Sequence, residues 1–163
     1  MNGWTSDKAW SDQYMPAIKR ILGEHLIGAA PQEEDQERNT DLIVLRMEAV
    51  RIGCRLRRFS QIRYADEFTI RADRPSGAKT ELAKIIEGWG RYFFYGFAAE
   101  TEVGALSAWL LGDLNVFRLW FNRFMAQHQG RWPGIKKPNK DGSSSFLCFC
   151  IDDLPTDFIL ARC

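Results

Sequence analysis

Histidine is scarce in this sequence, and its cysteines do not form a metal-binding motif. Among 163 residues there are two histidines and four cysteines, and no two cysteines have Cys-x-x-Cys spacing. Structural zinc sites need four ligands at close and characteristic spacings, so we do not expect one here. We interpret Cys54, Cys148, Cys150 and Cys163 as reduced, mostly buried thiols of a cytoplasmic protein.

The sequence also lacks a membrane-length apolar segment and an excess of either charge. Its longest apolar stretches are interrupted by Gly, Asp or Arg, so we expect no signal peptide and no contact with a membrane. The 22 Lys and Arg nearly balance the 21 Asp and Glu, giving a formal net charge of +1. Any site for a polyanion must therefore come from a local cluster of charges.

The apolar content is sufficient for one hydrophobic core. With 163 residues, 45% of them hydrophobic, the chain is predicted to be a single domain spanning 1–163. We divide this domain into an N-terminal arm (1–14), a core (15–98) and a helical and strand extension (99–163). The arm shows no regular pattern before Ser11.

Clusters of opposite charge lie next to each other in the first half of the chain. Residues 24–48 are rich in Glu and Asp, whereas residues 51–74 contain seven arginines. The acidic segment is either a solvated connector or the place where Glu34 turns toward Asp41. Two carboxylates brought together would suit Mg²⁺ or Mn²⁺, which prefer oxygen ligands.

A β-hairpin is predicted over residues 40–58. Its first strand begins at Asp41 and is apolar through Leu42–Leu45, and its second strand covers Arg51–Arg58. Alternation in the second strand places Gly53, Arg55 and Arg57 on one face. The face is therefore predicted to be basic and narrow at Gly53.

A third strand, Glu67–Ala72, also alternates between apolar and polar residues. Phe68, Ile70 and Ala72 would face the core, so Arg71 can lie beside Arg55 or Arg57 on a shared polar face.

Helices and further strands are predicted around these three strands. The helices are Met15–Ile27, Lys79–Gly88 and Glu102–Gln129, the last with a candidate break near Gly112. The strands are Tyr92–Ala98 and Phe146–Ile151, and Gly130–Ser145 is a long loop. In the helix over Lys79–Gly88, the core face would comprise Leu82, Ile85, Ile86 and Trp89. The fold class is therefore α/β, with a central mixed sheet flanked by helices.

This order of elements resembles the PD-(D/E)XK, or restriction-endonuclease-like, nuclease superfamily. The core of that superfamily consists of a helix, three antiparallel strands, a helix and a strand, and the resemblance covers residues 15–98. It implies a nuclease-like core, with a C-terminal helix and strand added. Segments 39–45, 52–58, 68–71 and 80–90 also resemble small phage and prophage proteins, which implies the host cell cytoplasm as the location.

The resemblance also implies a set of site residues. Glu34 matches the first acidic residue of the superfamily and Asp41 the metal-binding Asp, with Mg²⁺ or Mn²⁺ as the cofactor. At the (D/E)-x-K element this sequence has Gly53-Cys54-Arg55, so the second acid is missing and Arg replaces Lys. Glu67 or Glu81 would have to supply the missing acid, and Lys84 the lysine.

The replacement of Lys by Arg changes the chemistry that is available. An arginine can hold a phosphate, but it stays protonated and cannot accept a proton. The candidate catalytic residues are thus Glu34, Asp41, Arg55 and Lys84. The candidate metal ligands are Glu34, Asp41, Glu67 and Glu81, and the candidate nucleic-acid-binding residues are Arg55, Arg57, Arg58, Arg71 and Arg74.

Four hypotheses stay open at this level. The chain is a metal-dependent nuclease with a variant site, a nuclease-like protein that binds DNA or RNA without cleaving it, or a phage protein that binds and inhibits a host protein. The fourth is purely structural, with Asp41 capping a turn and pairing with Arg55 or Arg57, which contributes ~0–1 kcal/mol if exposed. A homodimer is an assembly to test in each case.

Overall fold

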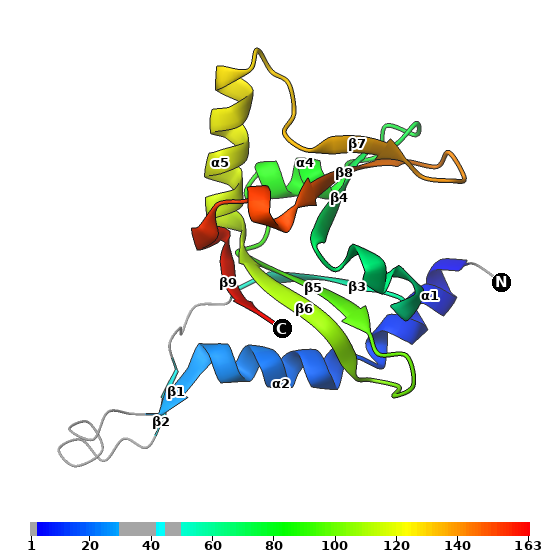
Figure 1. The fold of residues 1–163 in the computed structure, drawn as a ribbon, viewed down its shortest axis with the longest axis vertical. Coiled ribbons are helices and arrows are strands. Elements are labelled where there is room, and N and C mark those ends of the chain that lie inside the picture. Colours follow the sequence, from blue (N-terminus) through cyan, green and yellow to red (C-terminus); the bar gives the residue numbers. More distant parts are fainter. Residues whose placement is uncertain (1–2, 30–41, 45–49) are drawn as a thin grey trace. The chain divides into compact units, whose positions relative to one another are not determined.

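The structure, a computed structural model, describes residues 3–29, 42–44 and 50–163 (Figure 1). The chain divides into two compact units. The first unit comprises Met1–Ala49 and Ala98–Leu106, and the second comprises Val50–Phe97 and Ser107–Cys163. The predicted α/β class is confirmed, because helices accompany a mixed four-stranded sheet and a separate three-stranded sheet. No helix among the described residues is long and apolar enough to cross a membrane.

The first unit contains two helices and a small antiparallel sheet. Helix α1 is Gly3–Asp12 and helix α2 is Met15–Leu26, and strands β1 (Ile27–Ala29) and β2 (Leu42–Val44) pair with each other. Helix α2 was predicted, whereas α1 corrects the expectation of an irregular arm. An ion pair between Lys8 and Asp12 (2.8 Å) joins successive turns of α1, and Trp10 packs on Tyr14 beyond it.

The second unit contains both larger sheets. The mixed sheet has the order β3 (Ile52–Arg57), β5 (Tyr92–Ala98), β6 (Leu106–Asp113), β9 (Ile159–Arg162). The antiparallel sheet has the order β4 (Glu67–Asp73), β8 (Ser145–Cys150), β7 (Ile135–Pro138). The helices are η1 (Phe59–Tyr64), α4 (Glu81–Ile86), α5 (Leu114–Gln127), η2 (Ile151–Asp153) and η3 (Thr156–Phe158).

The predicted hairpin over residues 40–58 is wrong. Strand β2 pairs with β1, β3 pairs in parallel with β5, and β4 belongs to the other large sheet, so the three successive strands do not pair with one another. Gly53 lies opposite Phe93, and a Cβ at Gly53 would come within 2.9 Å of the Phe93 ring. The space beside Gly53 is therefore occupied by a core aromatic ring, which favours pairing with β5.

Residues 102–129 do not form one helix. Leu106–Asp113 is a strand, and Asp113 then begins α5 by accepting a hydrogen bond at Oδ1 from the Asn115 amide (2.7 Å). The run from Leu106 to Leu111 is largely apolar, and a short apolar run does not distinguish a buried strand from a helix. The predicted loop over Gly130–Ser145 likewise contains β7, which pairs with β8.

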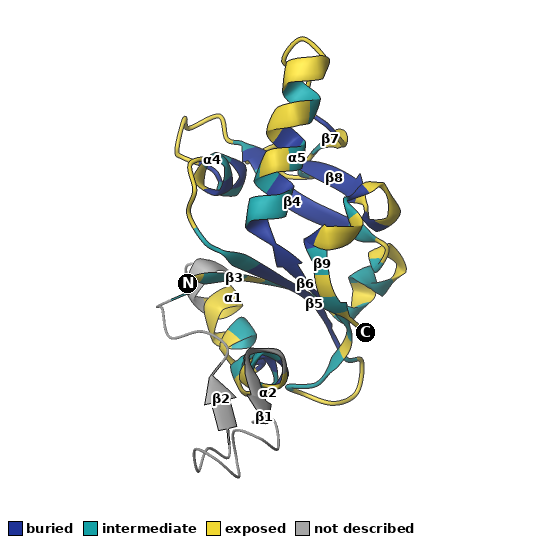
Figure 2. Ribbon diagram, turned by 90° about the vertical axis from the view of Figure 1, so that its left-hand side faces the viewer, coloured by how far each residue is buried: buried dark blue, intermediate teal, exposed yellow. Residues whose placement is uncertain are grey.

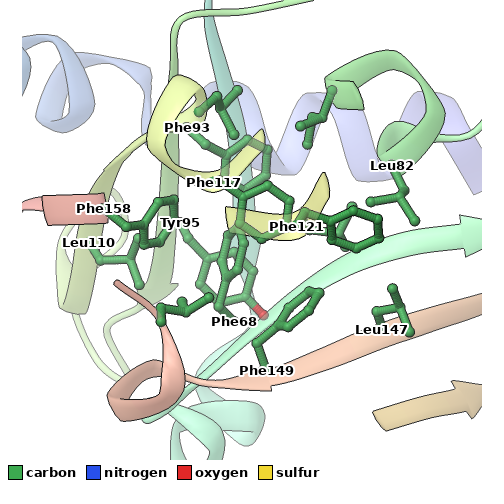
Figure 3. Packing of buried hydrophobic residues seen from close by; sticks show 14 of the residues in the cluster. Phe68, Leu82, Phe93, Tyr95, Leu110, Phe117, Phe121, Leu147, Phe149 and Phe158 are labelled. Atoms are coloured by element: carbon green, nitrogen blue, oxygen red, sulfur yellow. The ribbon is translucent and has the colours of Figure 1, made fainter. Parts of the chain in front are cut away.

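The core of the second unit lies between the two sheets and under α4 and α5. Phe68 is fully buried at its centre and packs on the rings of Phe93, Tyr95, Phe117, Phe149 and Phe158 (Figure 3). Helix α4 contacts β4 and α5, and Figure 2 shows β4, β5 and β8 as mostly buried strands. Tyr92–Ala98 is thus the interior strand that its apolar composition predicted.

Candidate functional site

A cleft of about 440 Å³ opens in the second unit beside β3 and α4. We call it the basic cleft, because the described residues that line it include six cationic side chains and one carboxylate: Arg51, Arg55, Arg71, Arg74, Lys79, Lys84 and Glu81. The exposed indole of Trp89 also lines it. Three of the predicted nucleic-acid-binding arginines, Arg55, Arg71 and Arg74, therefore meet in one hollow.

Three elements bring these side chains together. Strand β3 supplies Arg55, the end of β4 and the following loop supply Arg71, Arg74 and Lys79, and α4 supplies Glu81 and Lys84. Thr80 fixes α4 to β4, because its hydroxyl donates to the Ala72 carbonyl (3.0 Å) and accepts from the Ala83 amide (3.3 Å).

Glu81 holds Arg55 in place at the floor of the cleft. Its Oε2 accepts from Arg55 Nη2 (2.6 Å) and from the backbone amide of Arg71 (3.0 Å), and Arg55 Nη1 donates to the Thr69 carbonyl (3.2 Å). The side chains of Arg55 and Glu81 are only 20% and 26% exposed, so solvent screens this pair less than a surface pair. Arg55 therefore has a defined orientation before any ligand binds.

Carboxylates among the described residues do not balance the positive charge in the cleft. Burial lowers the pKa of Arg71, and the nearby charges of Arg74 and Arg55 lower it further, outweighing the opposite effects of Glu81 and Asp141. Lys79 pairs with Glu87 (2.6 Å), but both side chains are about half exposed, so this pair contributes little. An anion would relieve the mutual repulsion of the arginines.

Trp89 is the residue that departs most from its predicted place. It was assigned to the core face of α4, but 61% of its surface is exposed. The helix ends at Ile86, and Gly88 and Gly90 on either side of Trp89 have positive φ values of 97° and 78°. The guanidinium of Arg51 lies 6.0 Å from the centre of the Trp89 ring, within the range of a cation–π contact.

The other predicted arginines lie elsewhere. Arg57 lines a second hollow of about 690 Å³ with Thr69 and Tyr95, whose hydroxyls are hydrogen-bonded to each other (2.9 Å). Arg58 is exposed and does not line the basic cleft. Although Arg55 and Arg57 share one face of β3, they therefore line different hollows.

The predicted metal ligands are not gathered in the part of the chain that the structure describes. Glu34 and Asp41 lie outside the described residues. Glu67 accepts a hydrogen bond from the Cys148 thiol (2.8 Å), whereas Glu81 is bound to Arg55. Among the described residues no three His, Cys, Asp or Glu are placed to share an ion, and Glu81 among six cations does not fit a divalent cation.

Sequence reasoning missed three residues that contribute to the cleft. Arg51 and Lys79 were counted only as part of the charge or helix pattern, and Trp89 was assigned to the core. The signal for Trp89 was the Gly-Trp-Gly sequence directly after a short amphipathic segment, since glycines end helices.

Comparison with protein-family models, with curated proteins and with solved structures found no match.

Proposed function

We propose that this protein binds nucleic acid in the basic cleft, by contacts between its cationic side chains and phosphate groups. The observation that carries the proposal is the concentration of six cations around one carboxylate in a chain with a net charge of +1. Such a cluster is destabilised by self-repulsion when it is empty, and a polyanion is the ligand that removes this repulsion at several points together.

The chemistry of Arg55 supports a phosphate as the group that is bound. Among the described residues, Arg55 uses two of its five N–H donors, one on Glu81 and one on Thr69. The remaining donors can meet phosphate oxygens, for which the planar guanidinium is well suited. Arg71 and Arg74 add charge on the adjacent strand and loop.

Binding without cleavage is the function we favour. Arg55, which the nuclease resemblance aligns with the catalytic lysine, stays protonated and cannot act as a base. Glu81 is engaged by Arg55 rather than directed at an ion. Hydrolysis of a phosphodiester by a nuclease of the kind that the sequence resembles needs a metal-bound water. Of the predicted metal ligands that the structure describes, Glu67 and Glu81 are hydrogen-bonded to Cys148 and Arg55.

The proposal includes a cytoplasmic location. The four cysteines are free thiols, and Cys54, Cys150 and Cys163 are exposed, which corrects the expectation that most are buried. Exposed free thiols are typical of a reducing compartment, where nucleic acid is also available.

The test is binding of a fluorescently labelled oligonucleotide, followed by anisotropy in EDTA. We expect the double variant Arg74→Gln/Lys84→Gln to bind about tenfold more weakly or worse, because two charged phosphate contacts are lost. Both residues are exposed, so their replacement should leave the fold intact.

The matched control is Arg123→Gln/Arg131→Gln, which removes the same charge from exposed positions outside the cleft. It should bind like the wild type. An equal loss in both variants, or no binding by the wild type, would overturn the proposal. Cleavage of the oligonucleotide in Mn²⁺ that disappears in Asp41→Ala would show that the protein is a nuclease instead.

A further inference from the structure

Trp89 is presented to solvent by a well-fixed stretch of backbone. Gly88 and Gly90 both have backbone conformations that other residues rarely adopt, so the turn depends on glycine at these positions. The Trp89 amide donates to the Lys84 carbonyl (3.0 Å), and the Arg91 amide donates to the Arg51 carbonyl (2.8 Å). The turn is thus attached both to α4 and to the start of β3.

Helix α5 supports the same turn from the other side. Arg118 Nη1 donates to the carbonyls of Ile85 and Gly90, each at 3.2 Å. Burial lowers the pKa of Arg118, as expected for a guanidinium enclosed by protein rather than by water. The backbone around Trp89 is therefore fixed by hydrogen bonds, and it holds the indole at the surface.

The indole of Trp89 lies next to a cation and keeps accessible surface. Arg51 lies over the ring, and both residues line the basic cleft. A Trp that remains 61% exposed cannot be covered on both faces. The cleft therefore combines cations for phosphates with an open aromatic surface at its edge.

We propose that Trp89 stacks on an unpaired base, so that the ligand of the basic cleft is single-stranded nucleic acid. This inference rests on the proposed function and specifies its ligand. Bases in a duplex are stacked on one another and offer only their edges, whereas an unpaired base can present its flat face to Trp89. Stacking of this kind strengthens binding about 5- to 150-fold per base.

The test compares single-stranded and duplex oligonucleotides of equal length, and a chain of abasic deoxyribose phosphates. The wild type should prefer the single strand to both of the others. Trp89→Ala should bind the single strand about 5- to 150-fold more weakly and should change duplex binding little. Trp89→Phe, which keeps an aromatic ring, should recover most of this loss.

The chain offers a matched control in Trp132. This residue is 39% exposed and has Lys136 Nζ 5.6 Å from its ring centre, but it does not line the cleft. Trp132→Ala should bind the single strand like the wild type.

Two outcomes would overturn the inference while leaving phosphate binding in place. One is an equal loss of single-stranded and duplex binding in Trp89→Ala, and the other is equally tight binding of the abasic chain and the single strand by the wild type. If the wild type binds none of the three ligands, the proposed function fails as well.

Discussion

At the scale of single residues, Cys148 shows how a neighbour controls the chemistry of a side chain. Its thiol is buried on β8 and donates to Glu67 Oε2 at 2.8 Å. Burial raises the pKa of Cys148 to about 11, and the hydrogen bond and negative charge of Glu67 contribute to the increase. At pH 8 about one molecule in a thousand carries the thiolate that reacts with electrophiles.

We expect Glu67→Gln to increase the alkylation rate of Cys148. The substitution removes a negative charge that disfavours the thiolate, so the pKa of Cys148 falls and more thiolate is present at a given pH. The measurement is the rate of iodoacetamide labelling of Cys148 between pH 7 and 10, by peptide mass spectrometry, with exposed Cys163 as the internal reference. Equal Cys148 rates in the two proteins would contradict the role given to Glu67.

At the scale of elements, Asp113 joins the end of β6 to the start of α5. One carboxylate oxygen caps the helix at the Asn115 amide, and the other pairs with Arg91 at 2.9 Å. Asp113→Ala should lower the free energy of unfolding by about 2–4 kcal/mol. The substitution removes the helix cap, and it leaves the partly buried guanidinium of Arg91 without its carboxylate partner. Asp113→Asn, which can still cap, should lose less.

Urea denaturation of the wild type, Asp113→Ala and Asp113→Asn measures this difference. An m value that is the same in all three shows that unfolding exposes the same surface in each. If Asn and Ala are equally destabilising, the cap contributes nothing and the Arg91 pair accounts for the whole effect.

Several elements could be predicted from the sequence because their signals are local. Phe68, Ile70 and Ala72 alternate along β4, and the helical spacing of Leu82 and Ile85 places both in the core. The partners of the strands could not be predicted in this way. The parallel pairing of β3 with β5 depends on Gly53 meeting Phe93, a contact between residues far apart in the sequence.

The candidate site was predictable in its charges but not in its arrangement. Arg55, Arg71 and Arg74 were identified from a local excess of arginine, but their convergence around Glu81 depends on how α4 folds back on β4. Trp89 has the helical spacing of a core residue relative to Leu82 and Ile85. Because the helix ends at Ile86, this spacing does not place Trp89 on the same face as those two residues.

At the scale of the whole molecule, a nearly neutral chain carries a strongly basic cleft, which makes salt a sensitive probe. Four cleft cations, Arg51, Arg71, Arg74 and Lys84, form no ion pair with the described residues. If each contacts one phosphate of a single strand, log Kd should increase with log salt concentration with a slope of about 3.

Binding isotherms between 50 and 300 mM salt test this expectation, and the Arg74→Gln/Lys84→Gln variant should show about half the slope. A slope that is the same in both proteins would mean that Arg74 and Lys84 do not contact phosphate. A slope near zero in the wild type would mean that the ligand is not held by phosphate contacts at all.

The bridge from Glu81 to Arg55 and to the Arg71 amide has a consequence for the entropy of binding. An exposed arginine gives up rotamer freedom, about 2 kcal/mol, when a ligand immobilises it. In Arg55 the contacts with Glu81 and Thr69 remove much of this freedom during folding, so little is left to lose when a phosphate arrives. A carboxylate that opposes anion binding by its charge thus favours it by ordering the guanidinium that the anion meets.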